Sequence, residues 1–520
     1  MATEKIFRQL LQELATPEIR GVVGNINKME APVATVKVVE VINAVIECNN
    51  YKLCLKDGII YCYNGRCWGK VQEDEIKLFI HSAVDALGGD NIGRKHYRWK
   101  TEVYKQFMSE ALFVPKEKTE GQTLINLRNG TFEITAEHQL LREYRSEDFL
   151  RYCLDFDYNP QATAPMFQKF LNRVLPDKDC QAVLSEYMGY IFSKGLKLEK
   201  VLLLTGSGAN GKSTFFNIAT AIFGRDNVSS FSLQELTKGQ YQRAELQDVI
   251  VNFCSEISGK METAVFKQLA SGEPVSARHI FGRPFTMTDY AKMVFLCNEL
   301  PWQIEQTDAF FRRFIIIPFE QTIPEEERDP DLANKIIASE CSGVFNWMLD
   351  GLKRLLKNKR FTDSEVIRRQ IELFRYERDT VAVFLDQNNY VPSILKLERL
   401  ADLYDSYTVF CMGNRLRSVS RIAFSRKLHS CGYAMKREDV GYFVYIEVNK
   451  SAKRKRVSRI ELSNISVNTT DETKESDNET CNGQQKSESD NAEASAPAKR
   501  PVRTIPNKKK NDTSTEIHSK

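Results

Sequence analysis

The chain has 520 residues, 42% of them hydrophobic, and a formal net charge of +4. Its length is enough for several globular domains, and its near balance of charge means that any nucleic-acid contact must come from local basic clusters. No apolar run reaches about 18 residues, and the amino terminus lacks the apolar core of a signal peptide. We therefore expect a cytoplasmic multidomain protein of a bacterial or other host cell, with no membrane partner.

The first part of the chain predicts a small mixed α/β module over residues 1–145. An amphipathic helix is expected over 1–17, and turn pairs such as Asn64-Gly65 predict a β-meander over 51–70. Two helical patterns follow, and Asn129-Gly130 marks a second hairpin. These elements are expected at residues 73–87 (helix), 100–111 (helix) and 124–134 (hairpin).

A helical segment is expected over residues 146–198, directly before the most informative motif of the chain. Its two helices are predicted at 165–175 and 176–194, the second with Pro176 near its start and Gly195 after its end. This segment leads into an apolar strand that begins at Val201.

Residues 201–214 read VLLLTGSGANGKST, an apolar strand followed by a glycine-rich turn and a helical pattern over 215–223. Such a turn lets successive backbone N–H groups surround a phosphate, while Lys212 reaches the β- and γ-oxygens and the Ser213 hydroxyl holds Mg²⁺. The sequence therefore predicts a nucleoside triphosphate site with ATP and Mg²⁺ as ligands. Its residues are Gly206, Ser207, Gly208, Ala209, Asn210, Gly211, Lys212, Ser213 and Thr214.

Three further strand-like runs predict a mostly parallel α/β sheet in a core bounded at residues 199–325. They lie at 249–254, 293–297 and 314–318. The first run ends near Glu256, where a P-loop ATPase keeps a carboxylate that organises Mg²⁺ or polarises water.

The other two strand-like runs lie beside further candidate residues. Asn298 follows the second run and can hold water or the γ-phosphate. Arg312 and Arg313 precede the third, and one of them could reach a nucleotide held by a neighbouring subunit.

A basic hairpin is expected within this core over residues 275–286. Arg278, His279 and Arg283 would offer cations and an aromatic ring to a phosphodiester backbone, with Lys267 just before them. An ordinary surface hairpin with solvated charges is the alternative that these residues leave open.

The rest of the chain predicts a helical connector over 326–380, a winged-helix-like domain over 381–449 and a disordered charged tail over 450–520. The expected elements are helices at 336–356, 364–378, 397–410 and 420–430 and a hairpin at 433–446. Aromatic residues vanish after residue 450, and the basic clusters of the tail either hold phosphates or only solubilise the chain.

The ordered landmarks of the core resemble superfamily 3 helicases of the phage, plasmid and poxvirus primase-helicase type. They are GSGANGKST, Ser255-Glu256, KQLASGE, ARHIFGRPF, CNELP and FFRRF. The resemblance covers roughly residues 51–448 and implies an AAA+-like P-loop NTPase core. It also implies a ring, usually a homo-hexamer, that moves 3′ to 5′ on single-stranded DNA.

The resemblance further implies a role for each candidate residue. Lys212 and Ser213 would hold the triphosphate and Mg²⁺, Glu256 would activate water, and Asn298 would sense the γ-phosphate. Arg312 or Arg313 would be an arginine finger acting on the neighbouring subunit, and the basic hairpin would line the channel. Since Ser255 occupies the position where many related ATPases have a second acidic residue, Mg²⁺ would be coordinated more by Ser213 and water.

The function expected on this basis is an ATP-dependent DNA helicase that unwinds replication forks of a phage, plasmid or other mobile element. About 50 residues before the first hairpin are too few for a polymerase-type domain, so we expect no primer synthesis and a separate primase or polymerase as partner. Two alternatives stay open: an ATP-dependent replication initiator or loader without processive unwinding, and a DNA-independent P-loop ATPase or kinase.

Overall fold

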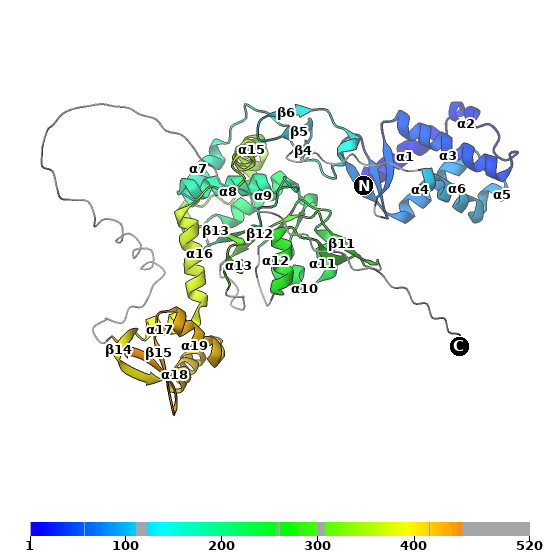
Figure 1. Cartoon of the computed structure of the whole chain (residues 1–520). Helices are drawn as coiled ribbons and strands as arrows, with labels where there is room; N and C mark the ends of the chain where they lie inside the picture. The colour runs from blue at the N-terminus through cyan, green and yellow to red at the C-terminus, as the bar shows by residue number, and fades with distance from the viewer. Residues whose placement is uncertain are drawn as a thin grey trace, which may run out of the picture. The chain divides into compact units, whose positions relative to one another are not determined.

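The computed structural model describes residues 2–56, 58–110, 122–255, 257, 261–280, 282–298, 307–414 and 416–449 (Figure 1). The amino-terminal region is built from helices around one apolar core, in which the Phe7 and Phe79 rings stack at 4.4 Å. Its helices are α1 (Ala2–Leu14), α2 (Pro17–Val23), α3 (Ala31–Cys48), α4 (Glu73–Ala86), α5 (Ile92–Lys95) and α6 (Tyr97–Glu110).

Helix α3 is the largest element of this region for which sequence analysis predicted nothing. It is rich in valine and isoleucine, residues more typical of strands, and eight of its 18 residues are buried. The predicted meander is confirmed as the antiparallel strands β1 (Lys52–Lys56), β2 (Ile59–Tyr63) and β3 (Trp68–Val71). A second antiparallel sheet confirms the predicted hairpin and adds a third strand, in the order β4 (Thr123–Leu127), β5 (Gly130–Ile134) and β6 (Gln139–Arg142).

The two helices predicted before the core are confirmed as α7 (Pro165–Val174) and α8 (Lys178–Tyr190). Asp177 caps α8 by accepting a hydrogen bond from the backbone N–H of Cys180 at 2.7 Å. The helix ends at Tyr190, before the predicted end at Lys194, so residues 191–200 form an irregular link to the central sheet.

The central sheet has five parallel strands in the order β13-β7-β12-β9-β8. They are β7 (Val201–Thr205), β8 (Val228–Ser229), β9 (Val251–Cys254), β12 (Lys292–Cys297) and β13 (Phe314–Pro318). The expected parallel sheet is thus confirmed. The strand that carries the glycine-rich turn lies between β13 and β12, the two strands whose ends carry the arginine pair and Asn298.

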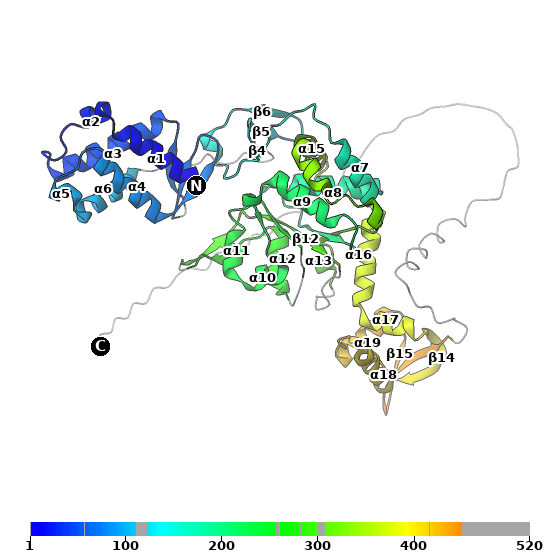
Figure 2. The same ribbon diagram turned by 180° about the vertical axis from the view of Figure 1, so that it is seen from behind.

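Helices cover both faces of this sheet (Figures 1 and 2). Successive side chains of a strand point to opposite faces, so each strand contributes to two cores. Leu202 and Leu204 join the core that contains α7, α8 and α9 (Lys212–Phe223), whereas Val201 and Leu203 join a second core on the other face. That face is covered by α10 (Leu233–Lys238), α11 (Gln240–Glu245), α12 (Thr263–Ser271) and α13 (Asp308–Phe311). The predicted basic hairpin is confirmed as β10 (Val275–Arg278) and β11 (Pro284–Met287).

The single helix predicted over 336–356 is wrong: the chain forms α14 (Leu332–Ser339) and α15 (Cys341–Asn358), which are separated at Glu340. The buried Glu340 carboxylate accepts hydrogen bonds from the backbone N–H groups of Met166 and Phe167, each at 2.9 Å. It thereby satisfies the first turn of α7, a long-range role that local periodicity does not contain. Helix α16 (Glu365–Arg378) follows as predicted.

The last described region has the element order of a winged helix, and its sheet order is β14-β16-β15. The elements are α17 (Thr380–Gln387), β14 (Tyr390–Arg399), α18 (Leu400–Gly413), α19 (Arg421–Ser430), β15 (Met435–Glu438) and β16 (Gly441–Val448). The helix predicted from residue 397 starts only at Leu400, because residues 397–399 pair with β16.

The predicted tail, 450–520, lies outside the described residues. Among the residues that are described, no helix has both the length and the apolarity needed to cross a membrane.

Candidate nucleotide-binding site

The glycine-rich turn between β7 and α9 leaves no room for side chains at two of its glycines. A Cβ at Gly206 would lie 2.3 Å from the Phe319 carbonyl oxygen, and one at Gly211 would lie 2.7 Å from Val174 Cγ1. Gly211 also has a φ of 83°, a conformation that favours glycine. The close turn predicted from the sequence therefore depends on contacts with α7 and with the chain after β13.

Two hydrogen bonds fix the turn to that following segment. The Asn210 side-chain amide donates to the Phe319 carbonyl at 2.8 Å, and the Ile323 backbone N–H donates to the Ala209 carbonyl at 2.9 Å. Asn210 is buried, whereas the neighbouring Ser207 and Ala209 are exposed. Asn210 thus anchors the turn to the segment after β13, and the exposed part of the turn is accessible to a ligand.

Lys212 is only 6% exposed, and its ammonium group lies inside the turn. It donates hydrogen bonds to the Gly206 carbonyl at 2.7 Å and to Asn210 Oδ1 at 3.1 Å. Burial lowers the pKa of Lys212, because desolvation penalises its charged form. A phosphate placed in the turn would supply the counter-charge that these neutral oxygens lack.

The first turn of α9 fits a triphosphate with Mg²⁺. Ser213 is exposed and Thr214 is half-buried at the helix amino terminus, where backbone N–H groups and the helix dipole favour an anion. The Ser213 hydroxyl is the group that would hold Mg²⁺, which supplies charge neutralisation to bound phosphates. The small, exposed and polar residues of this turn match that ligand.

The carboxyl edge of the sheet brings Asn298 beside the turn. Cys297 pairs with Thr205 in the β12–β7 register, so the exposed Asn298 directly follows at the level where the glycine-rich turn begins. Strand β9 ends at the same edge, because Cys254 pairs with Phe295. Glu256, the predicted water-activating residue, lies outside the described residues.

Arg312 and Arg313 lie at the opposite edge of the sheet. The Val201 backbone N–H donates to the Arg313 carbonyl at 2.8 Å, which places the pair beside the start of β7. Strand β13 runs from this edge to its fifth residue, Pro318, which pairs with Thr205. A strand of this length spans about 16 Å, so neither arginine lies near the glycine-rich turn of its own chain.

The two adjacent arginines have different surroundings. The Arg313 side chain is 9% exposed, donates to the Ser271 hydroxyl at 3.0 and 3.2 Å, and also donates to the Ala309 carbonyl. The Arg312 side chain is 64% exposed and pairs with Glu199 at 3.6 Å, a carboxylate that also lies 3.8 Å from Arg313. Arg312 is therefore the residue able to reach a ligand from outside the chain, a distinction that the sequence pattern did not contain.

The basic hairpin has the predicted cations at its tip. Arg283 is exposed, whereas Arg278 is half-buried and donates to the Gly282 carbonyl at 2.9 Å. The His279 ring stacks on the Phe285 ring with their centres 5.0 Å apart. Lys267 lies half-buried on α12, outside the hairpin. The tip thus presents ordered cationic and aromatic groups.

These features define a mixed α/β protein with a P-loop core: a parallel sheet whose central strand leads through a glycine-rich turn into a helix. Residues 10–176 match the family described as "D5 N terminal like", and residues 204–313 match the family described as "Family of unknown function (DUF5906)".

Curated viral proteins also match part of the chain. "Putative helicase L207/L206" of Acanthamoeba polyphaga mimivirus is 27% identical over 38% of this chain and 22% of that protein. "Putative helicase 121R" of Invertebrate iridescent virus 3 is 26% identical over 41% of this chain and 24% of that protein. The resemblance to superfamily 3 helicases of the D5-like type is thus confirmed. It spans about a quarter of the length of the curated relatives that it matches.

A solved structure, the apo NrS-1 C-terminal region, aligns with 78% of this chain and 98% of its own, with a TM-score of 0.44 and 11% identity. A second apo form of that region aligns with a TM-score of 0.42 and 10% identity.

Proposed function

We propose that this chain is an ATP-dependent DNA helicase that assembles into a ring, moves on single-stranded DNA and unwinds duplex DNA during replication. The observation that carries the proposal is the placement of the glycine-rich turn and Arg312 at opposite edges of one sheet. A chain built in this way has half of a hydrolysis site at each edge. Copies joined head to tail complete the site, and such contacts close into rings.

The residues have separate roles in this proposal. Lys212 and the backbone of the turn hold the triphosphate, Ser213 holds Mg²⁺, and Asn298 faces the γ-phosphate from the adjacent strand. Glu256 activates the attacking water. Arg312 from the neighbouring copy stabilises the charge that develops on the transferred phosphoryl group.

The basic hairpin forms a separate two-stranded sheet that the chain connects directly to the central sheet. Strand β9 leads through α12 into β10, and β11 leads back into β12, which carries Asn298 at its end. A residue that senses the γ-phosphate therefore lies on the strand that follows the hairpin. We infer that Arg278, His279 and Arg283 contact the phosphodiester backbone and that nucleotide state shifts their position.

The test is steady-state ATP hydrolysis by the wild type and by Lys212→Ala, with and without single-stranded DNA, over a series of salt concentrations. The proposal predicts DNA-stimulated turnover that salt weakens and that Lys212→Ala removes, because phosphate contacts release counterions. A forked-duplex assay then measures unwinding. Turnover that is indifferent to DNA would reject the helicase proposal and favour a DNA-independent ATPase.

A second candidate, an initiator or loader, is favoured by one observation. Helix α19 of the winged-helix region leaves Arg421, Arg426 and His429 exposed, and a helix of this motif enters the major groove of duplex DNA. A loader would bind duplex DNA strongly and separate little of it. Comparing duplex affinity with unwinding rate on one forked substrate distinguishes the two.

A further inference from the structure

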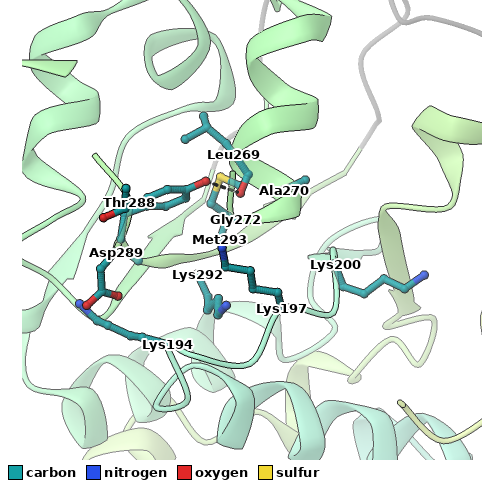
Figure 3. A pocket seen from close by; sticks show the side chains of 12 residues that line it. Lys194, Lys197, Lys200, Leu269, Ala270, Gly272, Thr288, Asp289, Lys292 and Met293 are labelled. Atoms are coloured by element: carbon teal, nitrogen blue, oxygen red, sulfur yellow. Dashed lines mark hydrogen bonds between the residues drawn. The ribbon is translucent and has the colours of Figure 1, made fainter. Parts of the chain in front are cut away.

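A pocket at the amino edge of the central sheet gathers four lysines (Figure 3). Lys194, Lys197 and Lys200 come from the link between α8 and β7, and Lys292 opens β12. The lining also includes Gly272 at the end of α12 and Asp289 after β11. None of these residues takes part in the glycine-rich turn.

The lysines differ in how well their charge is compensated. Lys194 and the single lining carboxylate, Asp289, approach each other in Figure 3. Lys292 donates to the Tyr190 hydroxyl and to the Leu196 carbonyl, each at 3.0 Å, and lies 4.2 Å from the Tyr190 ring centre. These are neutral partners. Lys197 is exposed and has no polar partner within the part of the chain that the structure describes.

Such an arrangement is unfavourable unless an anion enters it. Burial lowers the pKa of Lys292 to about 8; among its charged neighbours, Asp289 raises this pKa, whereas Lys194 and Lys197 lower it. Like charges at close range in a partly desolvated pocket repel each other. A bound phosphate group would reverse that repulsion and accept hydrogen bonds from several ammonium groups.

The position of the pocket separates it from the nucleotide of its own chain. Lys200 donates a hydrogen bond to the Arg312 carbonyl at 2.5 Å, so the pocket adjoins the edge that carries the exposed arginine. It also lies at the base of the basic hairpin, since Thr288 and Asp289 directly follow β11. In the proposed function, both the edge that carries Arg312 and the basic hairpin contact ligands from outside the chain.

We propose that this lysine pocket is a second phosphate-binding site, centred on Lys197 and Lys292 and distinct from the glycine-rich turn. The phosphate belongs either to a nucleic-acid backbone that continues from the hairpin or to a nucleotide held by an adjoining copy. This inference rests on the proposed function for the choice of these two sources.

The test uses the full-length chain and the substitution Lys197→Gln, which removes a charge from an exposed side chain and should not affect folding. Lys353→Gln on α15 is the matched control, because Lys353 is also exposed and lies outside the pocket. Lys197→Arg retains the charge. One arm measures anisotropy of a fluorescein-labelled oligo(dT) without nucleotide over a salt series, and the other measures kcat and KM for ATP with saturating oligo(dT).

A nucleic-acid source predicts that Lys197→Gln weakens oligo(dT) binding about fivefold or more and reduces the salt slope by about 0.7, the value for one contact to a single strand. A nucleotide source predicts unchanged oligo(dT) binding and a change of at least about fivefold in kcat or KM, set by loss of one charge-assisted contact. Lys197→Arg should restore either value. If both arms stay within about twofold of the wild type, as expected for Lys353→Gln, the phosphate site is rejected. DNA-stimulated turnover of the wild type tests the proposed function separately.

Discussion

The two edges of the central sheet are built from different chemistry. At the carboxyl edge, backbone groups and small side chains form a turn around one buried lysine, Lys212. At the amino edge, long cationic side chains gather, among them the exposed Arg312 and Lys197. The first edge is shaped by contacts within the chain, whereas the second has more cationic charge than the described residues around it neutralise.

In the proposed function, the two edges serve different copies of the chain. A turn fixed by Phe319 and Val174 can bind a nucleotide within one copy. An arginine about 16 Å away along β13 cannot contribute to that same nucleotide. The proposal therefore makes each edge half of a site, and variants at the two edges should have different effects.

The largest effect is expected from Arg312→Ala. Loss of an arginine finger should reduce turnover by about 10³ or more while nucleotide affinity changes by less than about threefold, because the finger stabilises only the transition state. Turnover and the Kd of a fluorescent ATP analogue measure the two. Arg368→Ala is the matched control, since Arg368 is 63% exposed and forms one ion pair with Asp363. Normal turnover in Arg312→Ala would reject the finger assignment.

Lys212→Ala should reduce nucleotide affinity and turnover together, with turnover falling by about 10². Lys212 is the one side-chain cation inside the turn among the described residues, so both the bound triphosphate and the transition state lose it. Turnover and the Kd of a fluorescent ATP analogue again measure the two effects. A variant that loses turnover but keeps wild-type affinity would show that Lys212 does not hold the ground-state triphosphate.

Arg313→Ala should lower the free energy of unfolding, and not only turnover. The substitution removes hydrogen bonds to the Ser271 hydroxyl and leaves the Ala309 carbonyl without this donor, at a cost of about 1–3 kcal/mol. Urea denaturation measures the free energy of unfolding, with Arg312→Ala as the control of wild-type stability. Equal stability of the two variants would contradict the difference in burial.

The smallest effect concerns pH and Lys292. Its pKa is about 8 in the folded chain against an ordinary value of 10.5, so the unfolded chain binds more protons between these values. The penalty for its charge is complete below pH 8 and disappears as pH rises toward 10.5, so stability from this group rises with pH. The wild type should gain stability relative to Lys292→Met between pH 8 and pH 10, measured by urea denaturation. If the difference in stability between the wild type and Lys292→Met does not depend on pH, the pKa of Lys292 is not lowered in the folded chain.

Much of the site could be predicted from local sequence because its parts are continuous in the chain. The glycine-rich turn, its strand and its helix occupy one stretch, and the basic hairpin occupies another. The break at Glu340 could not be predicted, because the carboxylate caps a helix that lies far away in the sequence. Local patterns also gave no reason to separate Arg312 from Arg313.

The lysine pocket was missed for a similar reason. Lys194, Lys197 and Lys200 are close in sequence, but Lys292 joins them only because β12 pairs beside β7. Helix α3 was missed because its β-branched residues fit a strand as well as a helix. In each case the decisive contact is long-range, and periodicity within one segment does not record it.

The most direct test of the account mixes two inactive variants. Lys212→Ala keeps an intact arginine edge and Arg312→Ala keeps an intact turn, so equal mixing should restore turnover at about a quarter of the interfaces of a head-to-tail ring. The measurement is DNA-stimulated ATP hydrolysis by each variant alone and by the mixture after exchange of subunits. A shared site predicts turnover in the mixture well above that of either variant alone. A mixture as inactive as its components would contradict the claim that the two edges of the sheet complete each other's sites.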